Sequence, residues 1–310
     1  MDSRPGRRAD RTHSHEEHDL ITQIAEITLP IFVIALIGFF YSRAVKPDLS
    51  GANRLVVDIA LPILIFTSLS AKDFNPLAVA LFSVASVAVI LLSGLLAYPL
   101  SKLSGASWRA LLPCVMFTNV GPVGIPLLVL AYGPAGLVPA VVLLVLSNIL
   151  HFTLGAGLMS GRIDWRMVYA NPLVWATLAG IAFSQVQWSL PGWLDSPLHM
   201  IGNVLVPMML LSLGARLSSS AIEDAVTGMA ATLITLSTRL IATLIILQAI
   251  PLHGVERGAL ILFACMPSAV FNFLLADRFQ RQPTKVASMV IVGHGASLAV
   301  LPLGIWLAFR

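Results

Sequence analysis

Long apolar stretches follow one another through most of this chain, with few charged residues between them. Of its 310 residues, 57% are hydrophobic and 11% are charged, whereas about 25% of the residues in a soluble domain are charged. Ten of the charged residues lie within residues 1–26, which leaves too few to cover a soluble fold. These features exclude a soluble enzyme, a nucleic-acid-binding protein and a secreted disulfide scaffold, and they predict a polytopic membrane protein.

A helix that crosses about 30 Å of hydrocarbon needs roughly 20 mostly apolar residues. On this basis the sequence predicts an all-α protein with ten transmembrane helices and short connections. The spans are expected near residues 27–44, 54–71, 77–99, 110–131, 137–158, 166–185, 198–217, 226–249, 258–277 and 286–308. The first span follows a long polar segment and is therefore expected to be retained rather than cleaved as a signal peptide.

The polar segment 1–26 is predicted to be a disordered tail. It contains His13, His15 and His18 beside two glutamates, which are suitable metal ligands, but no rigid helix is predicted to hold them together. Cys114 and Cys265 lie in apolar stretches and form neither a disulfide framework nor a metal-binding pair. We therefore expect no bound metal and no cofactor.

Basic residues are concentrated in alternate loops, which predicts the orientation in the membrane. One side has only Lys72 and Arg257. The other side has eleven: Arg43, Lys46, Arg54, Lys102, Arg109, Arg162, Arg166, Arg216, Arg278, Arg281 and Lys285. Because basic loops face the cytoplasm, both termini are expected on the non-cytoplasmic side.

The two halves of the chain contain similar polar and proline patterns. Pro62 and Pro207 lie in similar apolar contexts 145 residues apart, and Pro122 and Pro267 have the same separation. With five helices in each half, similar halves would be inverted relative to each other, as in many secondary transporters. We predict two inverted repeats, over residues 27–160 and 165–310.

Helix-breaking residues occur in the middle of spans 4 and 9. Residues 118–126 include two prolines and two glycines, and residues 265–272 contain Pro267. Broken backbone must avoid lipid, so the two breaks could cross and direct half-helix N-termini at an anion near the midplane. The alternative is a proline kink in an ordinary packed helix. The candidate substrate-binding residues are Asn119, Gly121, Pro122, Gly124, Pro126, Pro267, Ser268 and Asn272.

Four other polar residues lie at membrane depth and are candidates for ion coupling or anion contact. Arg239 could contact an anion or pair with a buried acid, or it could be structural. Asp58 could take part in proton coupling or pair with Arg54 one turn away. His151 and His294 occupy near-equivalent places in the two halves and could bind protons, although a neutral core histidine is the commoner case.

The run from Asn119 to Pro126 and the Met266-Pro267-Ser268 segment resemble the auxin efflux carrier family, as do Leu61-Pro62 and Asn171-Pro172. The resemblance covers about residues 27–310. It implies a fold similar to the bile acid sodium symporters, with ten helices, two inverted repeats and crossed broken helices 4 and 9. It also implies that Asn119 contacts a substrate carboxylate, and that Gly124-Ile125-Pro126 and Pro267 form the crossovers. The short segment between spans 5 and 6 resembles bacterial members, which suggests a bacterial inner membrane.

The function predicted on these grounds is secondary transport of a small organic anion such as malonate, malate or an auxin-like acid. The family resemblance implies an elevator mechanism, in which spans 3–5 and 8–10 move against spans 1, 2, 6 and 7. The alternatives are a sodium-coupled organic anion symporter of the bile-acid type, a channel and a membrane-embedded enzyme, for which the buried ionisable residues are too scattered. Coupling to H⁺ or Na⁺ and a homodimeric assembly stay open.

Overall fold

Helices occupy each of the predicted spans. The computed structural model describes residues 6–71, 76–186, 190–219 and 222–310, and within these residues it contains helices and no β-strand. The first half comprises α1 (Gly6–Val45), α2 (Ser50–Leu55), η1 (Val56–Ala60), α3 (Leu61–Leu69), α4 (Ala80–Leu100), η2 (Ser101–Ser104), α5 (Trp108–Met116), η3 (Val120–Gly124), α6 (Ile125–Tyr132), η4 (Gly133–Gly136), α7 (Leu137–Leu150), η5 (His151–Gly155) and α8 (Ala156–Ser160). The second half comprises α9 (Arg166–Tyr169), α10 (Pro172–Gln185), α11 (Gly192–Ser219), α12 (Ala225–Ala249), α13 (Gly254–Cys265), α14 (Phe271–Arg278) and α15 (Pro283–Phe309).

Helix α1 begins earlier than predicted. Its backbone is helical from Gly6, whereas the sequence predicts a disordered tail over residues 1–26. Among the residues whose side chains are described, the stretch Ile21–Val45 is long and apolar enough to cross a membrane, and it contains the predicted span 27–44. The side chains of His13, His15 and His18, and the whole of Lys72, lie outside the described residues.

Seven continuous helical stretches of the described residues are long and apolar enough to cross a membrane. One of them, Val120–Ser160, extends over 41 residues and takes in parts of predicted spans 4 and 5. Predicted spans 4, 6 and 9 do not contribute a long uninterrupted helix of their own, because α5, α10, α13 and α14 have 9, 14, 12 and 8 residues. The protein is an integral membrane protein, and the count of ten spans stays a prediction.

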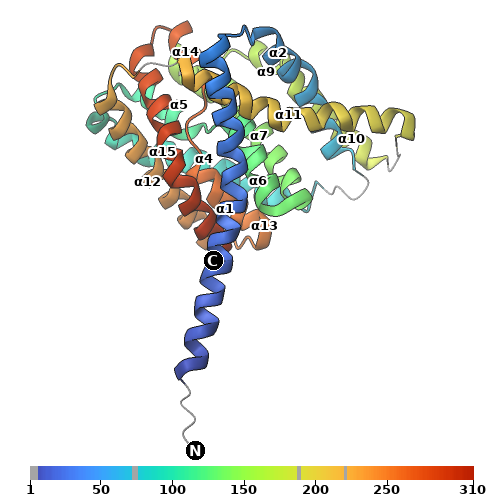
Figure 1. The fold of residues 1–310 in the computed structure, drawn as a ribbon. Coiled ribbons are helices and arrows are strands. Elements are labelled where there is room, and N and C mark those ends of the chain that lie inside the picture. The colour runs from blue at the N-terminus through green and yellow to red at the C-terminus, as the bar shows by residue number, and fades with distance from the viewer. Residues whose placement is uncertain (1–5, 72–75, 187–189, 220–221) are drawn as a thin grey trace, which may run out of the picture.

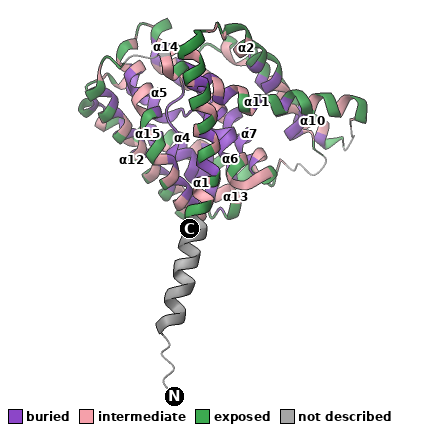
Figure 2. Cartoon of the chain, viewed as in Figure 1, coloured by how far each residue is buried: buried purple, intermediate pink, exposed green. Residues whose placement is uncertain are grey.

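The helices pack in two groups. In one group α1 packs against α11, and α3 packs against α10 and α11. In the other, α12 packs against α4 and α15, and α13 packs against α15. Figure 1 shows α10 and α11 extending to one side of the molecule, with the start of α1 and the end of α15 at the end opposite α2 and α14. Exposed residues cover the outer faces of the helices in Figure 2, as expected for surfaces in contact with lipid.

Helices α1 and α11 approach closely because glycines lie at their contact. A Cβ atom on Gly214 would lie 1.8 Å from the carbonyl oxygen of Ala35, and one on Gly38 would lie 2.1 Å from that of Leu211. Small residues at such contacts allow membrane helices to pack backbone to backbone. The two glycines therefore fix the separation of α1 and α11.

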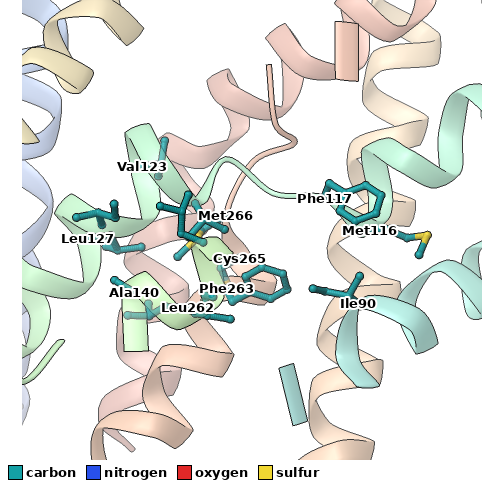
Figure 3. Packing of buried hydrophobic residues seen from close by; sticks show 14 of the residues in the cluster. Ile90, Met116, Phe117, Val123, Leu127, Ala140, Leu262, Phe263, Cys265 and Met266 are labelled. Atoms are coloured by element: carbon teal, nitrogen blue, oxygen red, sulfur yellow. The ribbon is translucent and has the colours of Figure 1, made fainter. Parts of the chain in front are cut away.

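The apolar core surrounds the two broken segments. Phe117 and Phe263 are almost fully buried, as are Met116 and Met266. Figure 3 shows Met266 beside Val123 and Leu127, with Phe117, Met116 and Ile90 on the other side of Phe263. Close packing holds both breaks in place at the centre of the molecule.

Candidate functional site

The two broken segments meet at their breaks. In the first segment α5 ends at Met116 and η3 begins at Val120, and in the second α13 ends at Cys265 and α14 begins at Phe271. Thr118 and Ser268 pair as an isolated antiparallel bridge. The Asn119 amide donates to the Pro267 carbonyl at 2.9 Å, and the Ala269 amide donates to the Phe117 carbonyl at 3.0 Å. Each break therefore supplies hydrogen-bond partners for backbone groups of the other break. Broken helices in a membrane need such partners, because lipid cannot provide them.

A cavity of about 540 Å³ lies beside this crossover. Its polar lining residues are Asn53, Asp58, Thr118, Asn119, Ser147, Asn148, His151, Asn171, Ser212 and Arg216. Among the described residues that line it, Asp58 and Arg216 are the only two that carry a full charge. A cavity of this size with a few polar groups in an apolar wall is typical of a small-molecule site.

The amino-terminal ends of both half-helices border the cavity. Asn119, Val120 and Gly121 line it from the start of η3, and Val270 and Phe271 line it from the start of α14. The first amides of a helix lack intrahelical acceptors and carry partial positive charge. The cavity therefore combines two such ends with amide side chains, which suits an anion.

Three π-helical turns also contribute to the cavity wall. Residues Val56, Val57 and Asp58 line it from η1, and Gly121 and Pro122 from η3. His151 and Phe152 line it from η5. Single π-turns within α-helices frequently occur at functional sites, because they redirect side chains from the regular helical positions. Their coincidence at one cavity strengthens its assignment as the functional site.

Two asparagine–histidine pairs join the half-helices to neighbouring helices. Asn119 Nδ2 lies 2.9 Å from His294 Nε2, and His151 Nε2 lies 2.8 Å from Asn272 Oδ1. The His151 ring also stacks on Phe117, with ring centroids 4.3 Å apart. All four polar side chains are buried. The pairs place both histidines next to the crossover, and His151 and Asn119 at the cavity itself.

The remaining predicted residues lie around the crossover but outside the cavity lining. Pro267 and Ser268 lie in the second break, and the Ser268 hydroxyl donates to the Cys114 carbonyl. Gly124 packs against the Met266 side chain, and Pro126 is buried at the start of α6. Arg239 is 1% exposed and donates to main-chain carbonyls at the ends of α5 and α13.

Asp58 is exposed and faces the cavity rather than Arg54. The described residues contain no ion pair between Asp58 and Arg54, although the two are one helical turn apart. Arg216, Asn148 and Ser212 line the cavity although they were not predicted as site residues. Polar residues in otherwise apolar helices were the only signal in the sequence, and it becomes informative only when the neighbouring helices are known.

A second cavity of about 860 Å³ adjoins the first. It includes Arg43 and Lys46, and it shares Asn53, Ser212 and Arg216 with the central cavity. Three basic side chains therefore line the approach to the polar cavity. Such an arrangement attracts anions from solution.

A helical membrane protein in which two broken segments cross beside a polar cavity has the architecture of a solute transporter. The family described as membrane transport protein matches residues 23–164 and 158–307. The chain belongs to this family, which is that of the auxin efflux carriers.

Several relatives carry transporter names. The chain is 30% identical over 296 residues to an "Uncharacterized transporter" of Methanothermobacter thermautotrophicus, across 90% of this chain and 96% of that protein. It is 31% identical over 136 residues to "Auxin efflux carrier component 8" of Arabidopsis thaliana, across 42% of this chain and 37% of that one. It is 23% identical over 218 residues to a "Putative malonate transporter" of Rhizobium meliloti, across 64% and 68%. These names point to membrane transport and away from an enzyme.

Proposed function

We propose that this protein is a secondary transporter of small organic anions, and that it binds a mono- or dicarboxylate in the cavity at the crossover. The observation that carries the proposal is the meeting of two half-helix N-terminal ends with Asn119 at one cavity. Partial positive charge at both ends stabilises a carboxylate without a buried lysine or arginine at the same point.

The chemistry of the cavity supports a carboxylate substrate. Arg216 supplies one full positive charge, and Asn148 and Asn171 supply amide donors. The volume of about 540 Å³ accommodates malonate, malate or indole acetate. The names of two relatives, "Putative malonate transporter" and "Auxin efflux carrier component 8", both refer to organic acids.

The proposed topology is ten transmembrane helices in two inverted five-helix repeats, over residues 27–160 and 165–310. In this topology α5, η3 and α6 form broken helix 4, and α13 and α14 form broken helix 9. Two observations support it. Each half contributes one asparagine and one histidine to the two pairs, and the start of α1 and the end of α15 lie at the same end of the molecule, as an even number of crossings requires.

The proposed mechanism is alternating access of the elevator type. The group of α1, α3, α10 and α11 acts as the scaffold, and the group of α4 to α8 and α12 to α15 moves with the crossover. The most extensive packing within each group supports the division, and α1 also contacts α6 and α15 across it. The loops that contain the eleven basic residues named above face the cytoplasm, and both termini lie on the opposite side. The proposed location is a bacterial inner membrane.

Uptake into proteoliposomes tests the function. The purified protein is reconstituted, and uptake of labelled malonate, malate and indole acetate is compared with uptake into protein-free vesicles. We expect saturable uptake of at least one acid, competed by related carboxylates. Equal counts in loaded and protein-free vesicles across a wide carboxylate panel would refute the transporter proposal. Turnover of a lipid or peptide without flux would support the membrane-embedded enzyme instead.

A further inference from the structure

Arg239 is a fully buried cation whose three hydrogen-bonded nitrogens all donate to main-chain oxygens. Its Nε donates to the Val115 carbonyl at 2.5 Å, Nη1 to the Met266 carbonyl at 2.5 Å and Nη2 to the Cys114 carbonyl at 2.8 Å. The residue lies in the middle of α12 and is 1% exposed. Among the described residues it has no carboxylate partner.

The acceptors come from the C-terminal ends of two different half-helices. Cys114 and Val115 are in the last turn of α5, and Met266 immediately follows α13. Carbonyls in the last turn of a helix lack intrahelical donors and carry partial negative charge. At the end of α5, the Phe117 amide donates to the Pro113 carbonyl and not to those of Cys114 and Val115. Because both helices break here, carbonyl oxygens without intrahelical donors converge on Arg239 from α5 and from α13.

A convergent set of carbonyl oxygens at broken helix ends is the kind of site at which transporters coordinate a coupling cation such as Na⁺. In this protein the Arg239 guanidinium already lies among those oxygens. The Ser268 hydroxyl also donates to Cys114, which completes the polar surroundings. A small cavity of about 30 Å³ adjoins Arg239, Pro267 and Ser268, and it has room for a water molecule.

We propose that the carbonyl oxygens of Cys114, Val115 and Met266 form a monovalent cation site that Arg239 occupies permanently. The guanidinium is attached to α12 and cannot dissociate, so it stabilises the two C-terminal ends without exchange. Anion-binding N-terminal ends thus face the cavity, and cation-binding C-terminal ends face Arg239. If the protein is the transporter proposed above, on which this consequence rests, a sodium ion does not need to occupy this position during transport.

Removing the side chain should convert the occupied site into one that binds small cations. The full-length protein is purified as wild type, Arg239→Ala and Arg281→Ala, and thermal unfolding is followed in choline, sodium, potassium and guanidinium chloride at equal ionic strength. Arg281 is the matched control, because its Nε also donates to a carbonyl, that of Met159, at 2.9 Å in a partly buried place. Concentrations of about 10–50 mM are far below the molar range in which guanidinium unfolds proteins.

We expect the same unfolding temperature for the wild type in all four salts. Arg239→Ala should unfold at a lower temperature, and guanidinium or Na⁺ should raise it in a saturable, concentration-dependent manner, as binding to the native state does. Arg281→Ala should show no such recovery. An Arg239→Ala variant as stable as the wild type, or one that no small cation stabilises relative to choline, would overturn the proposal.

A second pair of variants covers the case in which Arg239→Ala does not fold. Arg239→Lys keeps the charge, and Arg239→Met keeps the length without the charge. We expect Arg239→Lys to have the higher unfolding temperature of the two variants. An unfolding temperature of Arg239→Met equal to or higher than that of Arg239→Lys would contradict a cation site.

Uptake measurements distinguish a failure of the cation-site proposal from a failure of the proposed transport function. Malonate uptake by the wild type should be unchanged when an inward Na⁺ gradient is replaced by choline. Stimulation by Na⁺ would overturn the resident-cation proposal and leave the transporter intact. Absence of uptake for every carboxylate would refute the transporter, while the unfolding measurements would still decide the cation site.

Discussion

The Nδ2 atom of Asn119 lies 2.9 Å from the Nε2 atom of His294, although 175 residues separate them in the sequence. The Nδ1 atom of His294 lies 2.8 Å from the Val290 carbonyl, which can only accept. Nδ1 therefore carries the proton, and Nε2 accepts from Asn119. Because an amide nitrogen has two hydrogens, Asn119 keeps one donor for a ligand in the cavity. The pair fixes the side chain and leaves it able to bind a carboxylate.

Asn119→Ala should weaken carboxylate binding by about tenfold or more, since a hydrogen bond to a charged group contributes about 1.5–3 kcal/mol. The change removes the ligand contact, and it also removes the donor whose hydrogen bond His294 Nε2 accepts. Affinity is measured by titration calorimetry with a transported acid. The control is Asn203→Ala, which removes an exposed asparagine of α11 outside the cavity lining. Equal affinity of Asn119→Ala and the wild type would contradict the site.

Arg216 is the basic residue shared by both cavities, and its replacement should affect charge selectivity. Arg216→Ala should raise the KM for a dicarboxylate by about tenfold, and more than it raises the KM for a monocarboxylate, because one full charge is lost. Arg162→Ala is the matched control, since Arg162 is exposed and lines neither cavity. Uptake kinetics with malonate and a monocarboxylate measure the difference. Parallel effects of the two variants would exclude a specific role for Arg216.

Hydropathy and helix-breaking residues were sufficient to locate most spans and both breaks. The exact position of the first break was less predictable: Pro122 and Pro126 attract attention in the sequence, but the backbone leaves the helix at residues 117–119. The two prolines instead lie in η3 and α6, because proline is well accommodated in the first turn of a helix.

The role of Arg239 could not be predicted from side-chain identities. Its partners are main-chain carbonyls as far as 125 residues away, and every residue has a carbonyl. The same applies to the asparagine–histidine pairs, because spacing along the chain does not indicate which asparagine contacts which histidine. Such contacts depend on the crossing of the half-helices, which only a three-dimensional arrangement reveals.

The close approach of α1 and α11 leads to a stability prediction. Gly214→Ala would place a methyl group against the Ala35 backbone, which cannot move as a flexible side chain can. Overpacking costs about 1–3 kcal/mol, so the unfolding temperature in detergent should fall. Gly51→Ala is the control, because a Cβ atom there meets nothing within 4 Å. Unchanged stability of Gly214→Ala would contradict the close backbone packing.

Asp224 caps the start of α12 and should make stability depend on pH. The Thr227 hydroxyl and amide donate to its carboxylate at 2.7 and 3.0 Å, and these hydrogen bonds hold the pKa of Asp224 below its usual value. A carboxyl group with a lowered pKa in the folded state stabilises the protein above its unfolded pKa of about 3.9. This contribution is lost as the pH falls through the lower, folded-state pKa.

The unfolding temperature of the wild type should therefore fall as the pH decreases below about 4. Asp224→Ser retains a capping oxygen that does not titrate, so it should show a smaller decrease over the same range. Identical pH profiles for the two proteins would exclude the contribution of Asp224.

The proposed site places a carboxylate at the crossover of the two broken segments. An experimental structure of the protein with a transported acid, solved by electron cryo-microscopy, provides the decisive test. We predict density for the acid in the central cavity, with a carboxylate oxygen at hydrogen-bonding distance from Asn119 Nδ2 and near the start of η3. Density confined to the basic outer cavity around Arg43 and Lys46, with the central cavity empty, would rule out carboxylate binding at the crossover.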